Sequence, residues 1–362
     1  MGFDSFLGNP KAVTAVREML ASGRVPGALL FAGPDGVGKK TLALRLAKSL
    51  NCEKRPPGGA DFCGECPRCC KAEEFLTATR DDLARRRESK DAQKRTTGLV
   101  YFDIQLIEPI TRYILTDQIR QLRQVAYTHP FESPQRVFII DEAQTLHWQA
   151  VDLLLKVLEE PPDTTTLILI CPNAYQLRPT ISSRCRLIPF SQVDPAVIAE
   201  VLAEGRKLPP AQRELGVRVA AGSVAKAKKF NYEDFVSRRR PWLDFLDGIA
   251  SSAARSPAAT DWPLVFDATK ALADNRHDFE ETLDLGYSLL RDLLQILEAG
   301  PEPQVIHVDL RPRLAKWAQQ LGLGGLEKLK SGLDQACRLQ TRNVNQQLGF
   351  EVLAIDLAAG AN

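Results

Sequence analysis

The chain has 362 residues, 44% hydrophobic and 25% charged, which is typical of a folded protein of two or three domains and excludes a disordered or fibrous chain. Its formal net charge of +2 excludes nucleic-acid binding by overall charge, so any basic surface must be local. No apolar run reaches the ~18 residues that span a bilayer, and the N-terminus lacks a signal sequence. We therefore expect a cytoplasmic protein with no membrane partner and with reduced cysteines.

The first motif is a glycine-rich turn between a strand and a helix. Residues 27–33 (GALLFAG) form an apolar run typical of a buried strand, and residues 41–50 carry apolar side chains at helical spacing. This order is the context of a phosphate-binding loop, in which backbone N–H groups surround the phosphates and a lysine reaches the β and γ oxygens. The residues that would do so are Gly33, Gly36, Gly38 and Lys39.

The position after Lys39 departs from this motif. Ser or Thr is expected there, to bind magnesium through its hydroxyl, but the chain has Lys40. An ammonium group would repel the ion, and Thr41 lies ~100° further round the helix, where it is poorly placed to replace the hydroxyl. The loop predicts ATP or ADP as ligand and argues against Mg²⁺. The residues leave open hydrolysis, binding without hydrolysis, or a purely architectural loop, and we expect no efficient hydrolysis by the chain alone.

Four cysteines predict a metal site in the next segment, residues 52–70. Cys63, Cys66 and Cys69 are spaced C-x2-C-x2-C, and Cys52 lies upstream across a Pro/Gly-rich loop that can fold back. Four thiolates are the ligands of a structural zinc ion, which keeps no open position for catalysis. Free thiols or an iron–sulfur cluster are the alternatives. The other cysteines are Cys70, expected outside the site, and Cys171, Cys185 and Cys337, expected in the core.

Two further apolar runs predict buried strands. Residues 137–140 end in Asp141 and Glu142, and residues 165–171 form the next run. Aliphatic strands that alternate with helices predict a parallel sheet covered on both faces, and so an α/β fold for roughly the first 190 residues. An acidic residue at such a strand end holds magnesium through water, and Glu142 is suited to orient an attacking water.

The pattern changes outside these strands. Residues 73–98 are a polar insertion, expected to be a mobile loop or an exposed helix. From residue 194 onward nearly every segment has helical periodicity, which predicts a small helical unit up to residue 240 and a larger bundle after a linker at RRRPW. Breaks are expected at residues 207–212, 254–263 and 299–305.

Several motifs carry a family resemblance. They are FDSFLGNPKAV, LNC with CGECPRC, ILTDQIRQLRQ, VFIIDEAQTL, LLLKVLEEPPDTTTLILI and PTISSRC, with a weaker match at TRNVNQQLGFEVLAIDL. With these motifs the chain resembles the clamp-loader AAA+ subunits of the bacterial replicative DNA polymerase. The resemblance implies an AAA+ P-loop core over 1–192, an all-α lid over 193–240 and an all-α collar over 241–362. It implies as partners the gamma/tau and delta subunits of a hetero-pentamer, the sliding clamp and primed DNA.

The resemblance also implies roles for single residues. Arg184, in SRC, resembles an arginine finger that reaches ATP held by a neighbouring subunit, and Asn173 stands near the family's sensor position, where it would contact a γ-phosphate. Ala225 stands where the family has a second sensor arginine. Together with Lys40, these departures make the chain most similar to the delta-prime branch, a stator, rather than to the gamma motor.

Two alternatives stay open at this point. The first is an active, gamma-like ATPase in which Thr41 or a water replaces the lost magnesium ligand. The second is a different AAA+ machine, such as a helicase loader or a Holliday-junction motor, against which the cysteine motif and LEEPP argue. No polymerase active site is apparent in the sequence, so polymerase activity would belong to the complex.

Overall fold

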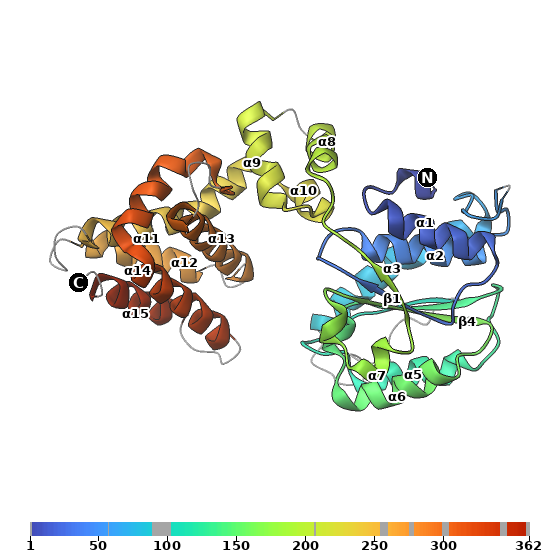
Figure 1. The fold of residues 1–362 in the computed structure, drawn as a ribbon. Helices are drawn as coiled ribbons and strands as arrows, with labels where there is room; N and C mark the ends of the chain where they lie inside the picture. Colours follow the sequence, from blue (N-terminus) through green and yellow to red (C-terminus); the bar gives the residue numbers. More distant parts are fainter. Residues whose placement is uncertain are drawn as a thin grey trace. The chain divides into compact units, whose positions relative to one another are not determined.

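A computed structural model of the chain describes residues 2–56, 58–88, 103–205, 208–253, 260–274, 279–298, 304–340 and 346–359. The fold divides into two compact units (Figure 1). The first runs through Ile198 and includes Gly222–Ala225. The second comprises Ala199–Ala221 and the chain from Lys226 onward.

The first unit is built on a five-stranded sheet in which every pairing is parallel. Its strands are β1 Ala28–Ala32, β2 Ile104–Ile107, β3 Arg136–Ile140, β4 Thr165–Cys171 and β5 Arg186–Pro189, in the order β2-β3-β4-β1-β5. Leu29 pairs with Ile168 of β4 and with Arg186 of β5. Because all strands run the same way, their carboxyl ends, and the loops that follow them, lie along one edge of the sheet.

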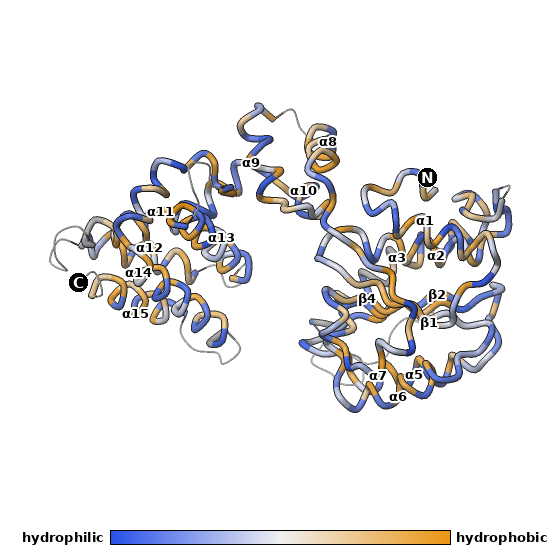
Figure 2. The backbone as a smooth tube through the Cα atoms, in the orientation of Figure 1, coloured by the Kyte–Doolittle hydropathy of each residue, from blue (hydrophilic) through white to orange (hydrophobic). Residues whose placement is uncertain are grey.

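Helices cover both faces of this sheet, as Figure 1 shows. One layer contains α1 Pro10–Ala21, α2 Lys39–Asn51 and α3 Pro67–Glu88, and the other contains α5 Thr116–Ala126, α6 Trp148–Glu159 and the short α7 Pro179–Ser182. Every residue of β1, β3 and β4 is buried, and these strands are among the most hydrophobic segments in Figure 2. The predicted parallel α/β fold is therefore confirmed. The sequence reading missed β5, whose residues are mostly exposed and give no apolar run.

Among the residues described in the second unit, every regular element is a helix, as expected. The remaining helices are α8 Pro195–Gly205, α9 Pro210–Ala220, α10 Val224–Lys229, α11 Tyr232–Ala253, α12 Trp262–Asp274, α13 Phe279–Glu298, α14 Arg311–Gln340 and α15 Gln346–Ala359, with 3-10 turns at Phe3–Ser5, Ala143–Thr145, Ala174–Gln176 and Val308–Leu310. The linker expected at RRRPW is helical, since α11 continues through Pro241. No described helix is both long and apolar enough to cross a bilayer.

The helical unit has its own core, with a buried histidine at its margin. Trp242, Phe245, Trp317 and Phe350 are all at most 1% exposed and pack together with aliphatic residues of α11 to α15. His307 is fully buried, and its Nε2 lies 3.0 Å from the Ser288 hydroxyl, which itself donates to the Leu285 carbonyl. The Nε2–H group therefore donates, and the other nitrogen is left as an acceptor.

That acceptor, Nδ1, lies 3.2 Å from a guanidinium nitrogen of Arg239, which also pairs with Asp309. Burial, with a further contribution from the Arg239 charge, lowers the pKa of His307 to about 4. Asp292 fixes the backbone here, because its carboxylate accepts hydrogen bonds from the backbone N–H groups of Ile306 and His307. The side chain of His307 is thus held neutral.

We expect the helical unit to lose stability as the pH falls from 7 to 5. Between the folded pKa of about 4 and the unfolded value of 6.5, the unfolded chain binds more protons at His307 than the folded chain does, so stability rises with pH in this window. The resulting loss in the free energy of unfolding between pH 7 and pH 5 is about 2 kcal/mol. Thermal unfolding of wild type and His307→Gln at both pH values measures it. A variant with an unchanged pH dependence would contradict the expectation.

Candidate functional site

The phosphate-binding loop follows β1 at the carboxyl edge of the sheet. Gly36 and Gly38 have φ of +74° and +99°, a region that side chains strongly disfavour. A Cβ on Gly36 would also lie 2.0 Å from the Ser223 hydroxyl, and one on Gly33 would lie 2.3 Å from the Phe190 carbonyl oxygen. Gly38 is the N-cap residue of α2, so the helix N-terminus faces the loop as predicted.

Lys39 is turned back onto its own loop. It is only 6% exposed, and its ammonium contacts the carbonyl of Gly33, the carbonyl of Pro34 at 2.7 Å and the carboxylate of Asp35 at 3.3 Å. These oxygens neutralise and solvate the charge within the loop. In this arrangement the lysine closes the loop rather than extending out of it.

Lys40 reaches across the carboxyl edge to two other strands. Its Nζ forms an ion pair with Glu108, just after β2, and lies 3.3 Å from the Asp141 carboxylate, just after β3. The three side chains are partly buried, with 29%, 15% and 19% of Lys40, Glu108 and Asp141 exposed. An ammonium ion thus sits between the strand-end carboxylates, where a phosphate-binding loop would otherwise place its metal.

The other residues predicted for this site lie at the same edge or close to it. Glu142 follows Asp141 in a left-handed conformation and is exposed. Asn173 follows β4, and its side-chain oxygen accepts from the backbone N–H of Tyr175 at 3.0 Å. Thr41 is exposed on α2, next to Lys40 in the sequence, and its role at a metal position stays a prediction. Asp141 and Asn173 therefore follow the carboxyl ends of β3 and β4, at the same edge of the sheet as the phosphate loop.

The segment around Ala225 covers the loop from outside the sheet. The backbone N–H of Ala225 donates to the Gly36 carbonyl at 3.1 Å, and Ser223 is buried next to Gly36. Ala225, the residue expected at a second sensor position, therefore lies beside the loop, but its side chain is a methyl group. The structure supplies no cation from this position to a phosphate.

Arg184 lies on the opposite edge of the sheet. It comes two residues before β5, whereas the phosphate loop follows β1. Arg186, which pairs with Leu29, is already ~13 Å from the level of Gly33 along the strands, and Arg184 lies beyond it. Its guanidinium donates to the Thr180 carbonyl and to the Glu159 carboxylate, each at 2.9 Å, and the side chain is 38% exposed. Arg184 is directed away from the loop of its own chain.

The four predicted zinc ligands come together. The Sγ atoms of Cys52, Cys63, Cys66 and Cys69 all lie within 4.8 Å of one another, and those of Cys52 and Cys63 are 3.5 Å apart. Tetrahedral zinc with Zn–S bonds of ~2.3 Å requires S–S separations of ~3.8 Å, so the cluster fits this ion. Cys70 is exposed and outside the cluster, as predicted, and Cys171 is buried. Cys337 is exposed, so its expected place in the core was wrong.

The surroundings of these thiols also suit a metal site. The backbone N–H groups of Cys63 and Cys66 donate to the sulfurs of Cys52 and Cys63, each at 3.3 Å. Although burial opposes ionisation, hydrogen bonds from backbone N–H groups and neighbouring thiols lower the pKa of Cys66 to about 6, while burial raises the pKa of Cys69. The cluster lies beyond the far end of α2, ~20 Å from Lys39. It is placed to hold structure, not to act on phosphates.

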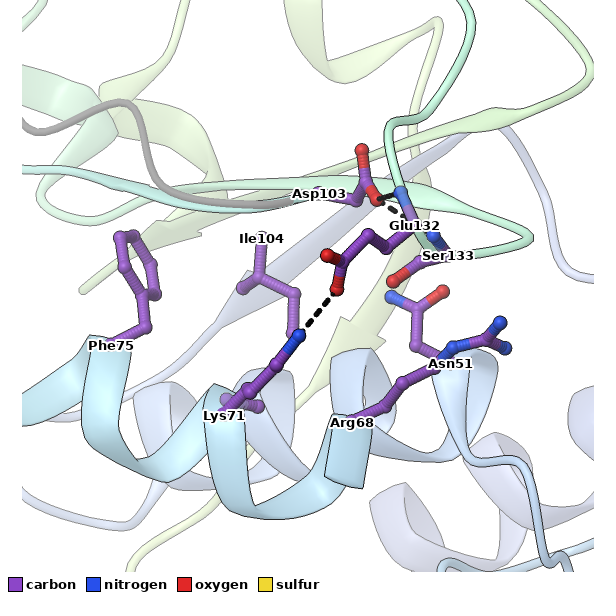
Figure 3. Close-up of a pocket in the computed structure, with 9 residues that line it drawn as sticks. Asn51, Arg68, Lys71, Phe75, Asp103, Ile104, Glu132 and Ser133 are labelled. Carbon is purple, nitrogen blue, oxygen red and sulfur yellow. Dashed lines mark hydrogen bonds and ion pairs between the residues drawn. The ribbon is translucent and has the colours of Figure 1, made fainter. Parts of the chain in front are cut away.

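Helix α3 ties this cysteine module, residues 52–70, to the sheet (Figure 3). Lys71 on α3 pairs with Glu132 at 2.7 Å, in the loop that leads into β3. Asp103 is buried and accepts from the backbone N–H groups of residues 131–133. Although burial opposes ionisation, these donors and Arg136 hold the pKa of Asp103 below its usual value. Within the insertion predicted at 73–98, α3 is helical through Glu88, and residues 89–98 lie outside the described residues.

Glu108 is the site residue that sequence reasoning missed. It directly follows the apolar run of β2, just as Asp141 follows that of β3. Because β2 and β3 are neighbours in a parallel sheet, acidic residues at both strand ends must lie close together. The position of Glu108 at a strand end could therefore be predicted from the sequence. Its pairing with Lys40 could not, because the two residues are 68 positions apart in the chain.

Comparison with known proteins assigns the family. The family model described as DNA polymerase III, delta subunit, matches residues 8–194, more than half of the chain. The chain belongs to the DNA polymerase III delta subunit family. The matched region of this family member contains the phosphate loop, the cysteine module and Arg184, and the membership confirms the resemblance found from the sequence motifs.

Relatives of this delta-family chain include two kinds of polymerase III subunit. The subunit delta-prime of Bacillus subtilis is 26% identical over 352 residues, 97% of this chain and 96% of the relative. The subunit gamma/tau of Mycobacterium tuberculosis is 27% identical over 326 residues, 86% of this chain and 48% of the relative, so the chain spans about half of that length. Among solved structures, a gamma subunit-related protein of Thermotoga maritima aligns with a TM-score of 0.48 at 16% identity, covering 97% of this chain and 100% of the other.

Proposed function

We propose that this chain is a clamp-loader subunit of the DNA polymerase III holoenzyme, which helps to place the sliding clamp on primed DNA. Family membership and similarity to a delta-prime subunit along nearly its full length support this role. Its partners are the gamma/tau and delta subunits of a hetero-pentamer. Within that complex the chain acts as a stator, which supports catalysis by a neighbour without hydrolysing ATP efficiently itself.

The observation that carries the stator role is the pairing of Lys40 with Asp141 and Glu108. The carboxylate that would hold magnesium in a working site is instead neutralised by a lysine of the same chain. Arg184, on the opposite edge, is the catalytic contribution: it leaves Glu159 and stabilises the charge on a phosphoryl group of ATP bound by the neighbouring subunit. Similarity to gamma/tau proteins supports an active motor as a second candidate, against which the Lys40 pairing argues.

The domain roles follow the same proposal. Residues 1–192 form the AAA+ core, 193–240 the lid and 241–362 the collar through which subunits assemble. Gly33, Gly36, Gly38 and Lys39 hold ATP or ADP when a nucleotide is bound, with Asn173 next to its terminal phosphate and Glu142 beside Asp141. The four clustered cysteines hold a structural zinc ion.

Reconstitution tests the proposed function. We expect this chain, mixed with gamma/tau and delta subunits of the same organism, to elute with them as one complex on size exclusion. That complex should load the clamp onto primed DNA at least ~10 times faster than a mixture that lacks this chain, because one ATP site of the ring would then lack its finger. A chain that does not co-elute, or whose omission leaves clamp loading unchanged, would rule out the clamp-loader role.

A further inference from the structure

The phosphate loop implies a magnesium ion, but the residues at its metal position do not fit one. Magnesium requires oxygen ligands in near-octahedral geometry. Here the residue that would supply a hydroxyl is Lys40, and its ammonium contacts the two carboxylates that would hold the ion or its waters, Asp141 and Glu108. The position thus already contains a cation, fixed to the protein backbone.

The pairing also explains how two strand-end carboxylates lie side by side. Asp141 and Glu108 are 19% and 15% exposed and approach the same nitrogen atom. Two partly buried carboxylates that both approach one nitrogen atom are close enough to repel each other unless a cation lies between them. In a metal-dependent site that cation comes from solution. In this chain Lys40 supplies that cation permanently. The hydroxyl ligand is then missing, and both carboxylates are occupied by the ammonium group.

We propose that the Lys40 ammonium is a resident cation that excludes Mg²⁺ from the phosphate loop, so that a nucleotide bound there is bound without metal. The exclusion rests on the loop geometry of this chain alone, and does not depend on what Arg184 does for a neighbouring subunit. It also gives the loop a ligand preference: a metal-free phosphate ester rather than a magnesium complex.

Manganese, a paramagnetic substitute for magnesium, tests the exclusion with the zinc-loaded full chain. Electron paramagnetic resonance of free Mn²⁺ measures how much ion is bound. We expect wild type to bind no Mn²⁺ at this position, so Asp141→Asn should leave Mn²⁺ binding unchanged. Lys40→Thr restores the hydroxyl and frees both carboxylates, and should bind Mn²⁺ at least ~10 times more tightly than wild type, because a like charge beside the ion is gone. The double variant Lys40→Thr/Asp141→Asn should lose that gain.

A matched control lies on the same helix. Lys48 pairs with the single exposed carboxylate of Glu73, so Lys48→Thr should gain no manganese site. Two results overturn the proposal: Mn²⁺ binding by wild type that Asp141→Asn abolishes, or no gain in a Lys40→Thr variant whose circular dichroism matches wild type. The wild-type measurement decides by itself if Lys40→Thr does not fold. None of these readouts involves other clamp-loader subunits, so failure here is distinct from failure of the clamp-loader role, which reconstitution tests.

Discussion

Arg184→Ala is expected to remove nearly all ATP turnover at the neighbouring site of the reconstituted clamp loader. An arginine supplied in trans contributes ~10³ to 10⁵ in rate at the site it serves, because it stabilises charge that develops on the transferred phosphoryl group. Arg184→Lys should not restore turnover, since an ammonium cannot reproduce the planar fork of a guanidinium. Steady-state ATPase of the complex, stimulated by clamp and primed DNA, measures the effect.

Two control variants separate this role from a structural one. Glu159→Gln removes the carboxylate that Arg184 contacts within its own chain, and should leave turnover unchanged if the arginine acts on a neighbour. If Glu159→Gln lowers turnover as much as Arg184→Ala does, the contact between the two residues is what matters. Lys39→Ala should also have little effect. Equal losses with Lys39→Ala and Arg184→Ala would mean that the loop of this chain is a working ATPase site. The chain would then be a motor subunit and not a stator.

Cys69→Ser is expected to lose the zinc ion, whereas Cys70→Ser keeps it. The two residues are adjacent, but Cys69 is 2% exposed within the cluster and Cys70 is exposed outside it. Loss of an outer-shell partner alone weakens metal affinity by ~10- to 100-fold, so loss of one of four ligands should exceed ~100-fold. Metal analysis of the purified chains should find about one zinc per chain in wild type and Cys70→Ser, and much less in Cys69→Ser.

The same pair distinguishes zinc from the alternatives. A chelator should lower the melting temperature of wild type and Cys70→Ser, because the free energy of metal binding is part of the folding free energy of the module. It should not change that of Cys69→Ser. Iron with its visible absorption in the purified chain would indicate an iron–sulfur cluster instead. Equal zinc in Cys69→Ser and Cys70→Ser would remove Cys69 from the ligand set.

Local patterns in the sequence were sufficient for much of this structure. The strand at 165–171 was predicted with its exact bounds and that at 137–140 to within one residue, because a run of aliphatic residues must be buried wherever it lies. The clustering of Cys63, Cys66 and Cys69 was predicted because C-x2-C spacing brings thiols close together, and that of Cys52 because a Pro/Gly-rich loop can fold back. The glycines of the loop were predicted because their conformations are required by the turn itself.

Tertiary structure decided what depends on residues far apart in sequence. β5 has little apolar signal and forms because β1 offers it a pairing edge. α11 continues through Pro241 within the helix packing of its unit, where local rules predict a break. By itself the sequence determined that Lys40 stands where the loop motif has Ser or Thr. Only the order of the sheet, which places β2 beside β3, decided that this lysine is held by Glu108 and Asp141, since ion pairs depend on distance in space and not along the chain.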